Sequence, residues 1–64
     1  MLDNKVYNLM LQLTEEHKSL WRIKKHYRED ASGCEECLAF WGELEKDKEE
    51  HIKELTGLIK KHLA

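Results

Sequence analysis

This 64-residue chain has 11 basic and 13 acidic side chains, a formal net charge of -2, three glycines and no proline. Its length allows one small domain, residues 1–64, in the size range where a single core supplies only about 3 to 5 kcal/mol of net stability. Acidic and basic residues are interleaved, so no face has the one-sided basic charge that nucleic acid or anionic lipid selects, and we expect neither as a partner.

The N-terminal segment MLDNKVYNLMLQL carries an acidic residue and lacks the basic start and continuous apolar run of a signal peptide. No apolar run approaches the roughly 20 residues that a membrane span needs. We therefore expect a cytoplasmic protein whose cysteines stay reduced.

The pattern of apolar residues in the first half of the chain predicts one amphipathic helix over about residues 3–29. Apolar side chains recur at steps of three and four residues, and Asp3 or Asn4 suits the N-cap position. The stripe that they form comprises Leu2, Val6, Leu9, Leu13, Leu20, Ile23 and Tyr27.

A turn at about residues 30–32 follows, because the segment REDASG breaks the apolar pattern. Ser32 and Glu35 have the spacing of a capping box, so a second helix is predicted over about residues 33–63. Its stripe comprises Cys34, Cys37, Leu38, Trp41, Leu44, Lys48, Ile52, Leu55, Ile59 and His62.

Two helices of similar length joined by a short turn predict an all-α, antiparallel two-helix hairpin. Large apolar groups beside each stripe would stay uncovered in such a hairpin, so we expect a C2 homodimer that forms a four-helix bundle. A monomeric hairpin or a piece of a larger hetero-complex is the alternative. The residues expected at the self-association surface are Met10, Leu13, Leu20, Trp21, Phe40, Trp41, Leu44, Ile52, Leu55 and Leu58.

A polar layer interrupts both stripes at the same height of the hairpin. Lys48 and His51 come from the second helix, and Glu16 and His17 from the first. An unpaired charge there is costly, so Glu16 and Lys48 are expected to pair. Such a layer fixes the register of the helices, or it forms a metal or catalytic site, as facing carboxylates and imidazoles do in helical bundles. The third alternative is that the lysine and histidine side chains extend outward to solvent.

The run AFWGELEKDKEEHIKEL, residues 39–55, resembles the second helix of rubrerythrin-type ferritin-like proteins, which carries a Glu-x-x-His motif. Glu16, in the upstream run LTEEHKSLW, is similar in placement to the Glu that the family's preceding helix contributes. The resemblance implies a ferritin-like fold and places Glu16 and His51 at ligand positions. Lys48 stands where the family has its bridging Glu, so the resemblance implies the fold more strongly than di-iron chemistry. Encapsulated ferritins, two-helix chains that assemble their iron site at a subunit interface, are similar in architecture.

A rearranged ligand set is a further hypothesis for this layer. Asp47 and His51 have i, i+4 spacing, Glu50 lies one step round the helix, and Glu16 or His17 would complete a nitrogen and oxygen shell for iron, manganese or another divalent ion.

Cys34 and Cys37 form a CEEC motif in the first turn of the second helix. A helix N-terminus stabilises a thiolate, but no βαβ unit accompanies the motif and a thioredoxin-like role is not expected. His26 and a partner chain would complete a zinc site. Alternatively, the two cysteines are small apolar residues that close the end of the bundle.

No hydroxyl in this sequence has a glycine elbow or an oxyanion nest around it, so no catalytic residue is assigned and we do not expect an enzyme. The sequence favours a non-enzymatic structural or protein-interaction role. A reduced ferritin-like metal-binding protein is the first alternative, and a zinc or thiol site at the cysteines is the second.

Overall fold

The computed structural model describes residues 3–63, and Leu2 of the expected stripe lies outside them. The first helical segment consists of α1 (Asn4–Arg22), the π-helix η1 (Ile23–Tyr27) and α2 (Arg28–Asp30). A turn leads to α3 (Glu35–Leu63). The described residues contain no strand, which confirms the all-α class.

α1, η1 and α2 form one continuous helix, because the residues at both junctions have right-handed helical backbone angles. The helix starts at Asp3, whose carboxylate accepts a hydrogen bond of 3.2 Å from the Lys5 backbone N–H. An acidic side chain at this position satisfies one of the free amide groups of the first turn.

η1 is a wide turn that the sequence pattern does not predict. The Arg28 backbone N–H bonds to the Ile23 carbonyl, five residues earlier, so the turn holds one extra residue. Lys24, within this turn, and Arg28, directly after it, both face α3, where their side-chain nitrogens lie 3.9 and 3.1 Å from the Glu45 carboxylate.

The connection between the two helices spans Ala31 to Cys34. Gly33 adopts a φ of 90°, a left-handed conformation that favours glycine, and a helix cannot start there. α3 therefore begins at Glu35, two residues later than expected. The expected cap at Ser32 is wrong, because Cys34 holds the N-cap position: its carbonyl accepts from Leu38 N–H and its sulfur from Cys37 N–H.

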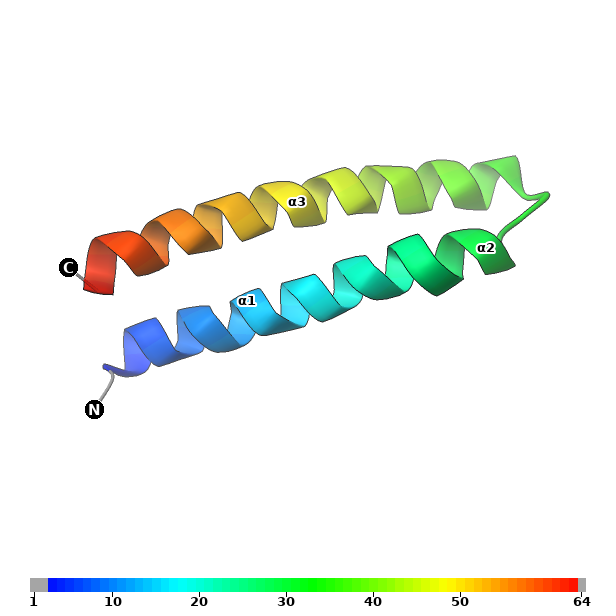
Figure 1. Ribbon diagram of the computed structural model, residues 1–64. Helices are drawn as coiled ribbons and strands as arrows, with labels where there is room; N and C mark the ends of the chain where they lie inside the picture. The colour runs from blue at the N-terminus through cyan, green and yellow to red at the C-terminus, as the bar shows by residue number, and fades with distance from the viewer. Residues whose placement is uncertain (1–2, 64) are drawn as a thin grey trace.

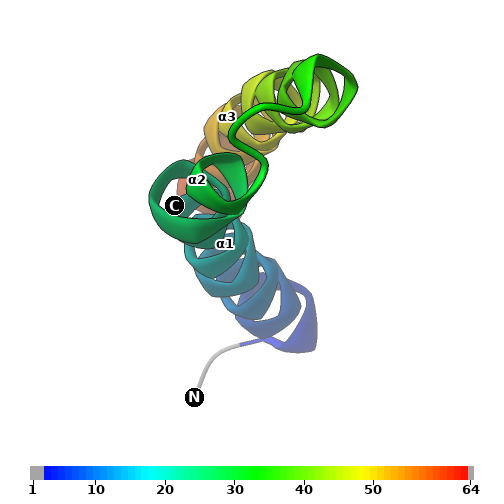
Figure 2. The same ribbon diagram turned by 90° about the vertical axis from the view of Figure 1, so that its right-hand side faces the viewer.

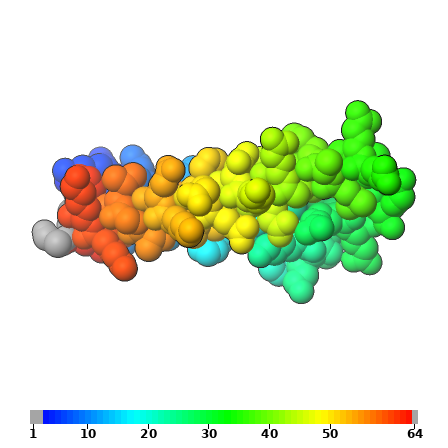
Figure 3. Space-filling view, turned by 90° about the horizontal axis from the view of Figure 1, so that it is seen from above, coloured from blue at the N-terminus to red at the C-terminus, as the bar shows by residue number. Residues whose placement is uncertain are grey.

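The two long helices run side by side in opposite directions, so the first and last described residues lie at the same end (Figures 1 and 2). The molecule is a rod of 48 × 16 × 12 Å, and α3 extends along its whole length when viewed from above (Figure 3). No helix within residues 3–63 is long and apolar enough to cross a membrane.

The seam between the helices has a thin core. Among the described apolar residues only Val6, Ile23 and Ile59 are buried. The other apolar members of the seam remain half-exposed, namely Leu9, Leu13, Leu20, Leu38, Trp41, Leu44, Ile52 and Leu55. Two helices alone thus leave much of their apolar surface in water.

Candidate functional site

Glu16 is the one buried charged residue among residues 3–63, with 6% of its surface exposed. It lies on α1 where the seam meets α3, and its Oε2 atom is 2.8 Å from the Lys48 ammonium. Oε2 receives no aligned hydrogen bond, so this contact is an ion pair. The Lys48 side chain is 21% exposed, which means that both charges are largely removed from water.

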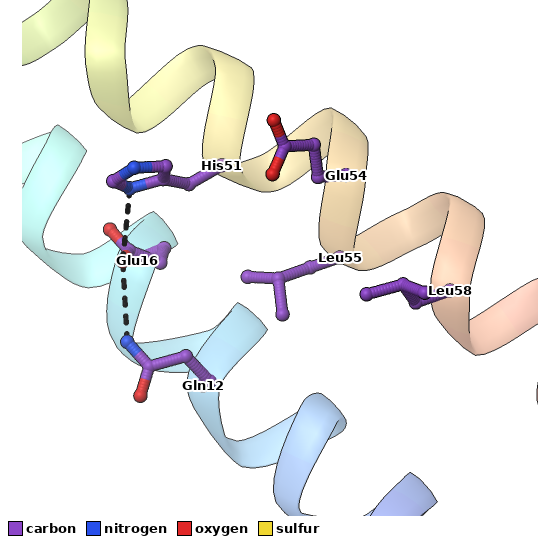
Figure 4. A pocket seen from close by; sticks show the side chains of 6 residues that line it. All are labelled: Gln12, Glu16, His51, Glu54, Leu55 and Leu58. Atoms are coloured by element: carbon purple, nitrogen blue, oxygen red, sulfur yellow. Dashed lines mark hydrogen bonds and ion pairs between the residues drawn. The ribbon is translucent and has the colours of Figure 1, made fainter.

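The other carboxylate oxygen of Glu16 has two polar neighbours. The Gln12 amide donates a hydrogen bond of 3.2 Å to Oε1, and the His51 Nδ1 atom lies 3.5 Å from the same oxygen (Figure 4). The sequence pattern does not predict Gln12 in the polar layer. However, Gln12 lies one helical turn before Glu16, and side chains at this spacing are neighbours on a helix, so its position indicates the contact. Three groups from two helices therefore surround one buried carboxylate.

The contact with the Lys48 ammonium is the main cause that holds the pKa of Glu16 below its ordinary value of 4.5. Burial opposes this effect, while the Gln12 hydrogen bond and the charges of Lys48 and His51 add to it. The balance favours the ionised carboxylate, so the layer carries a negative charge that Lys48 neutralises.

This lowered pKa predicts a loss of stability in acid. The Glu16 carboxylate binds a proton less readily in the folded chain than in the unfolded chain. The stability that the ionised carboxylate contributes is therefore fully present above the ordinary pKa of Glu16 and is lost as pH falls through its pKa in the folded chain. Urea unfolding between neutral pH and about pH 3 measures this loss. Glu16→Gln should reduce the loss of unfolding free energy in acid, whereas the exposed control Glu50→Gln should retain it. Equal pH dependence of the unfolding free energy in the two variants would contradict the assignment of this loss to Glu16.

His17 does not join the layer, which corrects the expectation. One residue corresponds to about 100° of rotation, so His17 points away from the seam next to Glu16. It lines a separate depression on the surface of the first helix with Lys18, Trp21 and Arg22.

The candidate metal ligands do not converge in the described chain. Asp47 and Glu50 are exposed on α3, and Glu50 lies 3.8 Å from the Lys53 ammonium. Within residues 3–63 no three His, Cys, Asp or Glu side chains are close enough to hold a metal ion. The set Glu16, His17, Asp47, Glu50 and His51 is therefore not assembled within the described chain: His51 is the member of the set on α3 that approaches Glu16, and the Lys48 ammonium occupies the other carboxylate oxygen of Glu16.

Cys34 and Cys37 form a second polar site at the start of α3. Their sulfurs are 2.6 Å apart, both thiols are free, and the Cys37 backbone N–H lies 3.3 Å from the Cys34 sulfur. His26 is not brought to this pair: its ring packs edge-on against Trp21, with ring centroids 5.1 Å apart. The expected third zinc ligand thus lies on another face of the first helix.

The residues expected at the self-association surface lie on different faces. Met10 and Trp21 line depressions made by the first helix alone. Leu55 and Leu58 line a groove between the helices whose other walls are Gln12, Glu16, His51 and Glu54 (Figure 4). Phe40, Leu58 and Trp21 are 55%, 44% and 54% exposed, while Trp41 packs against Tyr27 with ring centroids 5.0 Å apart.

No known protein family, curated protein or solved structure matches this chain. The likeness to rubrerythrin-type proteins therefore remains a resemblance in residues 39–55.

Proposed function

We propose that this chain is a cytosolic, non-enzymatic structural or protein-interaction module that self-associates as a C2 homodimer in the form of a four-helix bundle. The observation that carries the proposal is the unfinished core. With three buried apolar residues among those described, the seam holds less apolar burial than a 64-residue chain needs to offset its conformational entropy. A second copy would supply the missing burial.

One face of α3 suits a copy of itself. Phe40 and Leu58 are eighteen residues apart, which is about five helical turns, so they point in the same direction. The residues along this face occur at steps of four, three, four, four and three, namely Phe40, Leu44, Asp47, His51, Leu55 and Leu58. Along this face two apolar residues, two polar residues and two apolar residues follow one another, so the order of residue types is the same in both directions. An antiparallel, two-fold pairing requires such a pattern.

The pairing is complementary in size and in charge. Centred at Glu49, it sets Phe40 against the partner's Leu58 and brings Leu44 within one residue of the partner's Leu55. Near the axis it sets Asp47 against the partner's His51, a carboxylate against an imidazole. The Glu16–Lys48 pair beneath this face is neutral overall, so two copies of it would approach without net repulsion.

Two matched substitutions test the dimer. Leu58→Glu places a charge in the proposed interface, and the burial it removes from each copy is worth about 1.5 to 3 kcal/mol, so the dimer Kd should rise at least about tenfold. Leu11→Glu is the control, because Leu11 is 48% exposed, Leu58 is 44% exposed, and each has a glutamate four residues away.

Light scattering and sedimentation of the wild type and both variants give the answer. A wild-type dimer that only Leu58→Glu dissociates supports the proposal. A monomeric wild type at micromolar concentration, or equal dissociation by both variants, would contradict it and would leave this face to a different protein.

A further inference from the structure

The start of α3 carries two reactive side chains that have no role in the proposed dimer. Cys34 and Cys37 are both free, and their sulfur atoms are 2.6 Å apart. A disulfide bond is about 2.05 Å long, so bond formation needs a movement of less than about 1 Å along the line between the sulfurs. The local backbone already holds the two sulfurs together.

The two thiols have different roles in this contact. The two sulfur atoms are in contact at 2.6 Å, and the Cys37 backbone N–H donates to the Cys34 sulfur at 3.3 Å, whereas the Cys37 sulfur has no such backbone donor in the described chain. The thiol contact is the main cause that lowers the pKa of Cys34, the backbone N–H groups of Cys37 and Glu36 add to it, and burial opposes it. Its hydrogen bond to Cys34 raises the pKa of Cys37, as do burial and the Cys34 charge.

Both thiols are accessible to a small reagent. Cys37 is exposed and Cys34 is half-exposed. Cys37 also lines an open depression with Tyr27, Asp30, Ala31 and Trp41, so a reagent can approach the pair from the end of the rod. Cys34 lies before the face of Phe40 to Leu58, and Cys37, three residues before Phe40, lies at the end of this face and outside the pairs named for the dimer.

We propose that Cys34 and Cys37 are a dithiol that converts to an intrachain disulfide by exchange with a small-molecule disulfide, with Cys34 as the attacking thiol and Cys37 as the resolving thiol. The inference stands independently of the dimer, since it depends on the contact between two sulfurs of one chain.

The reaction has two steps. The Cys34 thiolate attacks one sulfur of the small disulfide RSSR, forms a Cys34–SR bond and releases RS⁻. Cys37 then gives its proton to solvent and attacks the Cys34 sulfur, which breaks the Cys34–SR bond and releases a second RS⁻. The cysteine pair loses two electrons, and RSSR gains them and becomes two RSH after protonation.

Oxidised glutathione is the probe for this exchange. The wild type, reduced and then incubated anaerobically with oxidised glutathione at neutral pH, should lose the mass of two hydrogen atoms and keep its mobility as a single chain on a non-reducing gel. Dithiothreitol should restore the dithiol mass. Persistence of both free thiols, a glutathione adduct as the final product, or a disulfide-linked dimer would each overturn the proposal.

Single-cysteine variants separate the two roles. Cys37→Ser keeps a hydroxyl donor and the backbone N–H next to Cys34, so it should trap glutathione on Cys34 and react several-fold faster than Cys34→Ser reacts at Cys37. Cys37→Ala removes only the side-chain donor and should react more slowly than Cys37→Ser. Far-UV circular dichroism checks that each variant is helical, and equal rates at the two cysteines would overturn the assignment of the attacking thiol.

Discussion

Replacing Lys48 with methionine is expected to lower the free energy of unfolding by about 3 to 5 kcal/mol at neutral pH, which is most of the stability that a chain of this size has. Methionine keeps an unbranched side chain of similar length but removes the ammonium. The Glu16 carboxylate, 6% exposed, then keeps only Gln12 and His51 as polar partners. An uncompensated buried charge is the physical cause of the loss.

Acid should cost this variant less stability than it costs the wild type. Without the ammonium, burial, which opposes the charged carboxylate, is the largest remaining influence on Glu16, and only the Gln12 hydrogen bond and the His51 charge still favour ionisation. The stability linked to ionisation of Glu16 is therefore smaller, and urea unfolding at neutral and acidic pH compares the slopes of the two proteins.

The double variant Glu16→Gln, Lys48→Met is the control for this experiment. It removes both charges, so it should recover a large part of the stability that Lys48→Met loses. A loss below about 1 kcal/mol for Lys48→Met, with the same slope in acid as the wild type, would show that water screens the pair as it screens surface salt bridges.

Replacing Ile23 with alanine is expected to cost about 2 to 5 kcal/mol, because this side chain is 1% exposed and its removal leaves a cavity. Ile23 begins η1, so the loss should fall on the segment that positions Lys24 and Arg28 against Glu45. Thermal and urea unfolding at one fixed protein concentration measures the effect, since association also contributes to stability.

Leu11→Ala is the matched control for the large-to-small change. Leu11 is 48% exposed, so its truncation should change the free energy of unfolding by no more than about 0.5 kcal/mol. Similar losses for Ile23→Ala and Leu11→Ala would show that the seam near η1 is not packed in solution.

The polar layer shows which parts of a site can be predicted from a sequence. The positions of Glu16 and Lys48 in their stripes follow from helical periodicity, and the cost of a lone buried charge predicts that they pair. The prediction that His17 faces the seam is wrong, because a residue beside the stripe points inward or outward according to how each helix is rotated about its axis. Neighbours along the chain do not set that rotation.

The start of α3 shows a different limit. Ser32 matches the usual N-cap residues and cysteine does not, so the sequence points to the wrong cap. The left-handed backbone at Gly33 moves the helix start past Ser32 and places Cys34 at the N-cap. The contact between the two thiols follows from that shift.

Local spacing by itself determined that this protein is all-α, that one turn near residue 32 divides it, and which side chains share a stripe. Those properties depend on the 3.6-residue helical period and on hydrophobicity, both of which are present in the sequence. The tertiary structure alone decided the π-turn at η1, the Lys24 and Arg28 contacts with Glu45, and the separation of Trp21 from Leu58 onto different surfaces. These features depend on the rotation of one helix against the other, which is set by packing across the seam.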